Sequence, residues 1–290
     1  MNGKHPEWLK KKAPDPAALA SMKTLLDGLS LCTVCESAEC PNQGECFARR
    51  TATFLILGDV CTRHCRFCAV KKGQPLPLDP LEPQNVALAV SKLELKHAVV
   101  TSVTRDDLAD GGAGHFEQTI QAIRQASSQT TIEVLIPDFK GSLDALKTVI
   151  ASSPEIINHN VETIPRLYPK VRPEANYNRS LNLLHAVKCI SRKILTKSGI
   201  MVGLGEKYEE VEAVLADLRA AGCNALTVGQ YLPPSPAHYK LVRYVTPQEF
   251  QEYQRLAERI GFSSVASGPF VRSSFNAAEA YEKMIMKSAA

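Results

Sequence analysis

The sequence predicts an α/β fold, a partial (β/α)6 TIM-like barrel with N-terminal and C-terminal extensions that close over the barrel mouth. Apolar runs of strand length alternate with runs of helix length through most of the 290 residues. No apolar run approaches the roughly 18 residues that suggest a membrane span. This alternation specifies a parallel sheet with right-handed crossovers, for which an open, doubly wound sheet is the alternative architecture.

Six strand–helix units make up the predicted barrel. The expected strands are 51–57, 97–103, 131–136, 156–161, 195–202 and 225–230, followed by helices at 85–96, 114–127, 142–152, 178–192, 209–221 and 247–260. Apolar residues from Val211 to Leu218 follow the i, i+3, i+4, i+7 spacing of a helix face that packs on a sheet. The run 246–249 (TPQE) combines an N-cap, a proline at the first helical position and a capping-box glutamate.

The chain divides into three predicted segments. Residues 1–50 form an arm with a short helix at 17–29, residues 51–262 form the barrel, and residues 263–290 form a C-terminal tail. Active sites of such sheets lie at the carboxyl ends of the strands. We therefore expect the arm and the tail to converge there.

Composition narrows the class of protein. Hydrophobic residues make up 44% and charged residues 22%, with a net charge of +4. This charge favours an acidic partner weakly, and aromatic-plus-basic clusters for binding nucleic acid are missing. The N-terminus lacks the apolar stretch of a secretory signal. We expect a cytoplasmic monomer that binds neither nucleic acid nor membrane.

Six of the nine cysteines fall into two triads. The first is Cys35-x4-Cys40-x5-Cys46 and the second is Cys61-x3-Cys65-x2-Cys68. In a reducing compartment such clusters favour metal binding over disulfides.

The second triad follows the first predicted strand, at the end where an active site is expected. Three thiolates at this spacing can each bind a different iron of a cubane [4Fe-4S] cluster, which leaves the fourth iron open to a substrate or cofactor. A structural zinc site is the alternative, and it needs a fourth ligand, for which His64 is the local candidate. A dinucleotide site is disfavoured because no Gly-x-Gly-x-x-Gly follows the strand.

The run CTRHCRFC, with Phe67 before its last cysteine, resembles the radical S-adenosylmethionine superfamily. The resemblance implies a [4Fe-4S] cluster on Cys61, Cys65 and Cys68 whose open iron binds the amino and carboxylate groups of S-adenosylmethionine. One electron then cleaves the sulfonium, and the 5′-deoxyadenosyl radical that forms abstracts hydrogen from unactivated carbon.

The first triad has two interpretations. Cys32 could complete a zinc knuckle with it. The run CESAECPNQGEC, however, resembles the auxiliary-cluster motif of the lipoyl synthase family. This resemblance extends over residues 5–276, through the blocks TSVTRDDLADGGA, NHNVET, RLYPKVRP, KSGIMVGLGE, VGQYLPPS and GPFVRSSF.

The resemblance implies insertion of two sulfur atoms, at C6 and C8 of a protein-bound octanoyl chain. The sulfur comes from a second [4Fe-4S] cluster that is consumed, with Cys35, Cys40, Cys46 and Ser274 as its ligands. Serine oxygen is a harder ligand than thiolate, so the iron it binds is easily lost. Arg272 is a candidate to orient Ser274 or the substrate.

Further residues are expected to contact S-adenosylmethionine, because they match the family's blocks at strand ends. They are Phe67, Thr101, Ser102, Arg105, Asn160 and Glu162. The alternative is that some of them only satisfy loop backbone or form ion pairs.

The implied substrate is an octanoylated lipoyl carrier domain, from the acyltransferase component of a 2-oxoacid dehydrogenase or from the glycine cleavage H protein. A one-electron donor such as flavodoxin or ferredoxin is also implied. Two alternatives are a sulfur-inserting enzyme of the biotin synthase kind and a non-catalytic cluster-binding or zinc-binding scaffold.

Overall fold

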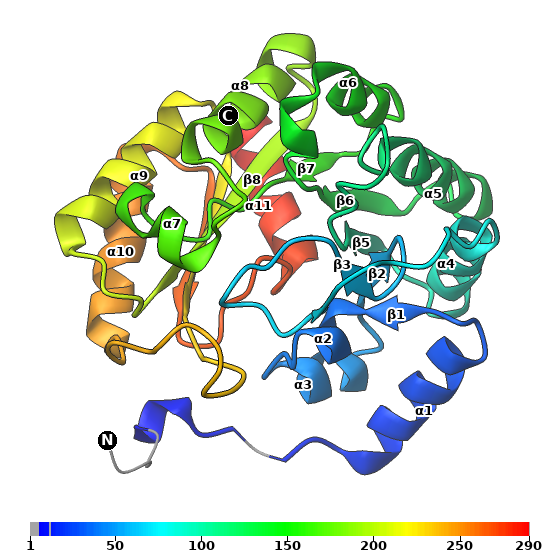
Figure 1. Cartoon of the computed structure of the whole chain (residues 1–290), viewed down its shortest axis with the longest axis horizontal. Helices are drawn as coiled ribbons and strands as arrows, with labels where there is room; N and C mark the ends of the chain where they lie inside the picture. The colour runs from blue at the N-terminus through cyan, green and yellow to red at the C-terminus, as the bar shows by residue number, and fades with distance from the viewer. Residues whose placement is uncertain (1–5, 12, 290) are drawn as a thin grey trace.

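The computed structural model describes residues 6–11 and 13–289, so residues 1–5 and Lys12 of the predicted arm lie outside it. One eight-stranded sheet curves into a ring with helices around its outer side (Figure 1). In sheet order, the strands are β1 (Cys32–Thr33), β2 (Thr53–Ile56), β5 (His97–Ser102), β6 (Thr131–Leu135), β7 (Ile156–Asn158), β8 (Leu195–Val202), β9 (Ala225–Gln230) and β10 (Ser264–Gly268).

The strands from β2 to β10 run parallel, and β1 pairs antiparallel with β2. Because β1 and β10 remain at opposite ends of the strand order, the barrel is open. The predicted partial TIM-like barrel is confirmed.

Six outer helices follow the strands as predicted. They are α4 (Glu82–Lys92), α5 (Ala113–Ala126), α6 (Leu143–Ala151), α8 (Tyr177–Ile190), α9 (Tyr208–Ala220) and α10 (Pro247–Ile260). The apolar face from Val211 to Leu218 is buried. At α10 the Thr246 hydroxyl accepts from the Glu249 amide (3.2 Å), and the Glu249 carboxylate accepts from the Thr246 amide (2.9 Å). This capping box fixes where the helix begins.

Shorter elements complete the chain. They are η1 (Glu7–Leu9), α1 (Pro16–Asp27), α2 (Val34–Ser37), α3 (Gln43–Ala48), β3 (Val60–Cys61), β4 (Lys71–Lys72), η2 (Phe139–Gly141), η3 (Pro165–Leu167), α7 (Tyr168–Val171) and α11 (Ala277–Ala289). In the part of the chain that the structure describes, no helix is long and apolar enough to cross a membrane. All nine cysteines are free thiols.

The predicted segment boundaries differ from the structure. The arm supplies β1 to the sheet, and the predicted tail supplies β10, which pairs with β9 from Ser264 to Gly268. The barrel therefore has a seventh parallel strand beyond the six predicted, and the boundaries at 50 and 262 cut through its sheet. The run SVASG has few large apolar residues, so its sequence pattern does not stand out as a strand.

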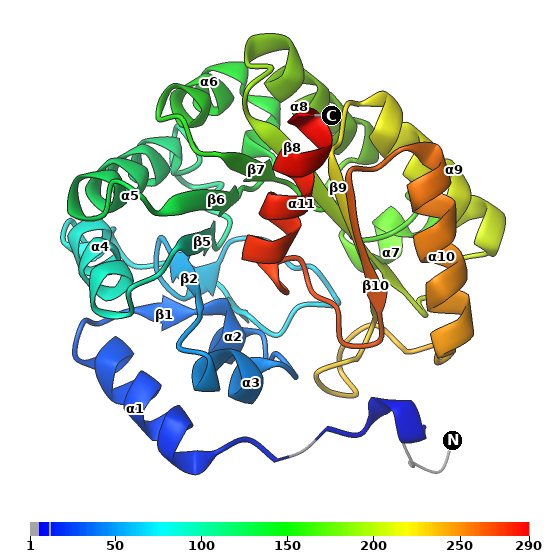
Figure 2. The same ribbon diagram turned by 180° about the vertical axis from the view of Figure 1, so that it is seen from behind.

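The C-terminal helix α11 lies within the ring of strands (Figure 2) and contacts both β5 and β10. Its Met284 is fully buried against Ile156, Leu195 and Ala225, which lie at the amino ends of β7, β8 and β9. This helix therefore closes the amino end of the barrel, whereas the prediction placed the whole C-terminal extension over the carboxyl end. Only the segment before α11 reaches the carboxyl end.

Candidate active site

A cavity of about 480 Å³ lies at the carboxyl ends of the strands, and we call it the large cavity. It brings together most of the predicted site residues, namely Cys35, Cys40, Cys61, Cys65, Phe67, Cys68, Thr101, Ser102, Asn160, Glu162, Arg272 and Ser274. Cys46 lines an adjoining cavity of about 210 Å³, the small cavity, together with Cys35 and Cys40. The arm and tail therefore converge as predicted.

The loop that carries the second triad is tied to surrounding elements through its backbone. The Thr62 amide donates to the Thr104 carbonyl (3.0 Å), and the Arg66 amide donates to the Val171 carbonyl (2.8 Å). The Sγ of Cys61 accepts from the Thr104 amide at 3.4 Å. These bonds tie the loop to the segment after β5 and to α7.

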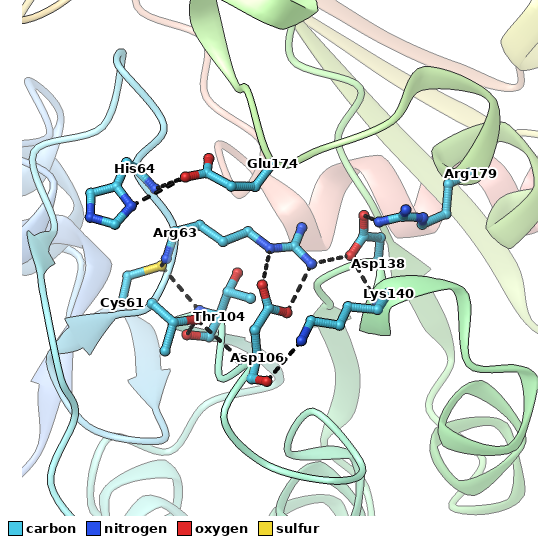
Figure 3. A network of polar contacts seen from close by, with 10 residues as sticks. Cys61, Arg63, His64, Thr104, Asp106, Asp138, Lys140, Glu174 and Arg179 are labelled. Carbon is cyan, nitrogen blue, oxygen red and sulfur yellow. Dashed lines mark hydrogen bonds and ion pairs between the residues drawn. The ribbon is translucent and has the colours of Figure 1, made fainter.

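Arg63, between the first two cysteines of this loop, is the centre of a charged network (Figure 3). Its guanidinium lies 2.7 Å from Asp106 Oδ2 and 2.6 Å from Asp138 Oδ1, and Arg179 adds a contact of 3.1 Å to Asp138. The Arg63 side chain is 4% exposed.

Burial opposes the positive charge of Arg63, yet the carboxylates of Asp106 and Asp138 raise its pKa. Burial likewise disfavours the charged form of Asp138, but hydrogen bonds from Arg63 lower its pKa to about 2. The network stays ionised and anchors the loop to the β5–α5 and β6–α6 connections.

Burial disfavours the thiolate form of several of these cysteines. Burial raises the pKa of Cys35 and Cys68 to about 12 and that of Cys65 to about 11, although Arg172 partly offsets the effect at Cys65. Iron–sulfur ligands must be thiolates, so cluster binding displaces these protons. Free thiols from two short segments at adjoining cavities fit such a group.

Polar groups beside the second triad lack partners. Ser102 Oγ and Asn160 Oδ1 are buried with no hydrogen-bond partner, and both residues line the large cavity. Because buried polar atoms are normally paired, these atoms suit a polar ligand. Gly199 leaves room for the Asn160 side chain in this position, since a Cβ at residue 199 would lie 2.9 Å from Asn160 Oδ1.

Glu162 is strained as well as buried. Its φ is +64°, a left-handed conformation that is uncommon for glutamate. Burial raises its pKa, while Arg172 and a 3.0 Å hydrogen bond from Asn160 Nδ2 oppose the rise. The Glu162 carboxylate and the Asn160 amide, which are hydrogen-bonded to each other, thus both line the large cavity.

Arg105 is the one predicted cofactor contact that does not line the large cavity. Its guanidinium forms two short contacts with Asp107 (2.8 and 2.9 Å) and donates to the Leu57 carbonyl (3.1 Å). It is buried in these contacts. Arg105 thus makes the ion pair of the alternative interpretation, and its contact with S-adenosylmethionine stays a prediction. Thr101 lines the cavity, but its hydroxyl donates to the Leu135 carbonyl at 3.0 Å.

Arg172 lines the large cavity and was not predicted. Its Nη1 donates to the carbonyls of Asn160 (2.9 Å) and Val161 (3.0 Å), and its Nε is buried without a partner. It holds the strand end that carries Asn160 and places a positive charge beside Cys65. Its position in the block RLYPKVRP was the only sequence signal, because its contacts are made by tertiary packing.

The tail reaches the first triad through two local features. Asn42, 1% exposed, donates from Nδ2 to the Phe270 carbonyl at 2.6 Å. A Cβ at Gly229 would overlap the Val271 carbonyl oxygen, so only glycine lets the tail lie against β9 there. Together these features bring Ser274 to the cavities that Cys35 and Cys40 line.

The zinc alternatives find no support in the geometry. Among the described residues, no three His, Cys, Asp or Glu side chains are arranged to hold a single metal ion. His64 is exposed and faces Glu174 at 3.2 Å, and Cys32 lines neither cavity. A cubane [4Fe-4S] cluster does not need its ligands to converge on a single metal ion, because each thiolate binds a different iron.

Comparison with known proteins places the chain. A model of the radical SAM superfamily matches residues 55–218. Lipoyl synthase of Alkaliphilus metalliredigens is 59% identical over 96% of this chain and 96% of its own length. That of Caldanaerobacter subterraneus is 56% identical over 96% of this chain and 97% of its own. These identities exclude the biotin synthase alternative.

Solved structures share the fold at low identity. Methylornithine synthase has a TM-score of 0.55 at 15% identity, covering 86% of this chain and 81% of its own. Streptococcus suis SuiB bound to S-adenosylmethionine has a TM-score of 0.54 at 10% identity, covering 76% and 51%. The fold is thus that of this superfamily, and the sequence relatives are more specific. The chain belongs to the lipoyl synthases, which are sulfurtransferase enzymes of the radical SAM superfamily.

Proposed function

We propose that this enzyme converts a protein-bound octanoyl chain to lipoyl by inserting sulfur at C6 and C8. The observation that carries the proposal is the convergence of two cysteine triads, from separate segments of the chain, on adjoining cavities that share a wall. Saturated carbons have no acidic proton for a general base, so hydrogen must leave as an atom. A sulfur donor must then lie beside the same carbon chain.

In this proposal Cys61, Cys65 and Cys68 hold one [4Fe-4S] cluster, and Cys35, Cys40, Cys46 and Ser274 hold an auxiliary one. When bound, these groups supply an electron to cleave S-adenosylmethionine and sulfide for insertion. Superfamily membership supports the first cluster and S-adenosylmethionine. The serine at the second site makes one iron labile, which suits a cluster that is consumed.

The remaining residues bind and orient. Ser102, Asn160 and Glu162 offer hydroxyl, amide and carboxylate groups for the amino acid and ribose portions of S-adenosylmethionine, and Phe67 covers it from the cluster loop. Arg272, half-buried in the large cavity wall with its Nη1 2.7 Å from the Val271 carbonyl, would orient Ser274 or the substrate. Burial lowers the pKa of Arg272, which Cys40 and Glu162 oppose.

We further propose that the octanoyl chain arrives on the lysine arm of a lipoyl carrier domain, from the acyltransferase component of a 2-oxoacid dehydrogenase or from the glycine cleavage H protein. Flavodoxin or ferredoxin would supply the electrons to a monomeric enzyme. The nine free thiols support a reducing, cytoplasmic location.

The serine ligand is tested by replacement of one hydroxyl. In Ser274→Ala, cleavage of S-adenosylmethionine should persist while sulfur insertion is abolished, because only the auxiliary site is altered. Ser273→Ala is the matched control, since Ser273 also lines the large cavity and should keep both activities. Normal lipoyl formation by Ser274→Ala would show that the ligand lies elsewhere.

A further inference from the structure

The first triad is accessible from two sides. Cys35, Cys40, Arg272 and Ser274 line both cavities, so they form a wall between them. Cys61, Cys65 and Cys68 line only the large cavity, and Cys46 lines only the small one. The small cavity therefore approaches the auxiliary site from the side away from the other triad.

The small cavity opens at the surface between α3 and the start of α11. Among its lining residues Glu45, Arg49, Thr51, Ala278 and Glu279 are exposed. Glu45 and Glu279 bring carboxylates to this opening. Glu45 is already paired with Lys11 (3.1 Å) and Arg49 (2.8 Å), whereas Glu279 accepts a hydrogen bond from Asn276 Nδ2 at 3.2 Å. Oxygen donors of this kind suit small divalent ions better than the long apolar chain of a substrate.

His97 lines the small cavity and has an unused nitrogen. Its side chain is 5% exposed, and its Nδ1 is buried without a hydrogen-bond partner. Its Nε2 lies 3.3 Å from Glu133 Oε2, and Lys197 Nζ lies 2.9 Å from Glu133 Oε1. A ring that donates from Nε2 to a carboxylate keeps its lone pair on Nδ1, as in metal-binding histidines oriented by a carboxylate.

We propose that the small cavity is a passage for ferrous iron to and from the auxiliary site, with His97 Nδ1 as a nitrogen ligand along it. The inference rests on the proposed function, in which the auxiliary cluster is consumed. Removing sulfide from that cluster frees iron while the substrate and S-adenosylmethionine fill the large cavity. Imidazole and carboxylate ligands suit Fe²⁺, so the small cavity offers this iron a separate way out.

Blocking the opening tests the passage. In a single turnover of holoenzyme with an octanoylated carrier peptide, S-adenosylmethionine and a reductant, product is followed by mass spectrometry and released Fe²⁺ by a colorimetric chelator. Ala278→Trp should form product at the wild-type rate, while iron release slows several-fold because the indole fills the opening. Glu282→Trp, an exposed position one turn along α11 that lines neither cavity, is the matched control and should release iron normally.

Iron release from Ala278→Trp that keeps pace with the wild type would overturn the passage. If wild-type enzyme made no sulfur-containing product, the proposed function itself would fail, so the two failures are distinguishable. His97→Gln tests the ligand separately, because glutamine can still donate to Glu133 but lacks the free nitrogen. The His97→Gln variant should slow iron release several-fold although the opening of the small cavity stays unblocked. Wild-type release from His97→Gln would remove His97 from the passage.

Discussion

Single charged side chains shape the site of the second triad. Arg63 lies within the cysteine loop, yet its partners Asp106 and Asp138 follow two different strands. Breaking a buried pair costs about 3–5 kcal/mol because the remaining charge is left uncompensated. Arg63 therefore links the position of the cluster loop to the stability of the barrel.

Arg63→Met should lower the free energy of unfolding of the cluster-free protein by about 2–3 kcal/mol, less than a fully broken pair costs because Arg179 still contacts Asp138. Urea denaturation measures the change. Lys147→Met is the control, since its exposed pair with Asp144 should be worth less than about 1 kcal/mol. Equal losses in the two variants would contradict the role of the buried network.

His159 predicts how stability depends on pH. Burial, helped by Arg172, lowers its pKa from 6.5 to about 4. The unfolded chain thus binds a proton below pH 6.5 that the folded chain takes up only near pH 4, so the free energy of unfolding falls as pH drops through this window. The contribution lost is about 3 kcal/mol, measured by urea titrations across the window.

His159→Gln should remove this part of the pH dependence, because glutamine does not titrate there. His64→Gln should keep it, since His64 is exposed. Parallel pH profiles for wild type and His159→Gln would rule out a buried neutral imidazole.

At the scale of elements, the C-terminal helix α11 is the least expected. Met284→Ala should lower the free energy of unfolding by about 2–5 kcal/mol, because it leaves a cavity at the amino end of the barrel. Met286, 70% exposed on the same helix, offers the control, and Met286→Ala should change stability by less than about 0.5 kcal/mol. A loss at Met284 no larger than that at Met286 would mean that α11 does not close the barrel as described.

Elements with strong local patterns were predictable. The strands 195–202 and 225–230 and the helix 247–260 match the structure residue for residue. Strand β7 was predicted to reach 161 but ends at Asn158, before the left-handed turn at Glu162. Strand β10 was missed because it forms by pairing with β9, and helix α11 was missed because its position depends on packing inside the ring. Neither kind of contact leaves a local sequence pattern.

At the scale of the whole molecule, the site residues that belong to short motifs with characteristic spacing were predictable from the sequence. The six cysteines of the two triads, Asn160 and Glu162 came from compact motifs, and each lines at least one of the two cavities. Arg172 was missed, because the partner of a guanidinium depends on loops that only the fold brings together. The sequence order of the strands was sufficient to place the site at their carboxyl ends.

The most direct test of the account is the mass of an octanoylated carrier peptide after incubation with the iron-loaded enzyme, S-adenosylmethionine and a one-electron reductant. The account predicts that two hydrogens are replaced by two sulfurs, and that enzyme with Cys61, Cys65 and Cys68 changed to alanine leaves the peptide unaltered. A wild-type enzyme that cleaves S-adenosylmethionine but leaves the peptide mass unchanged would contradict the claim that the two triads act on one substrate.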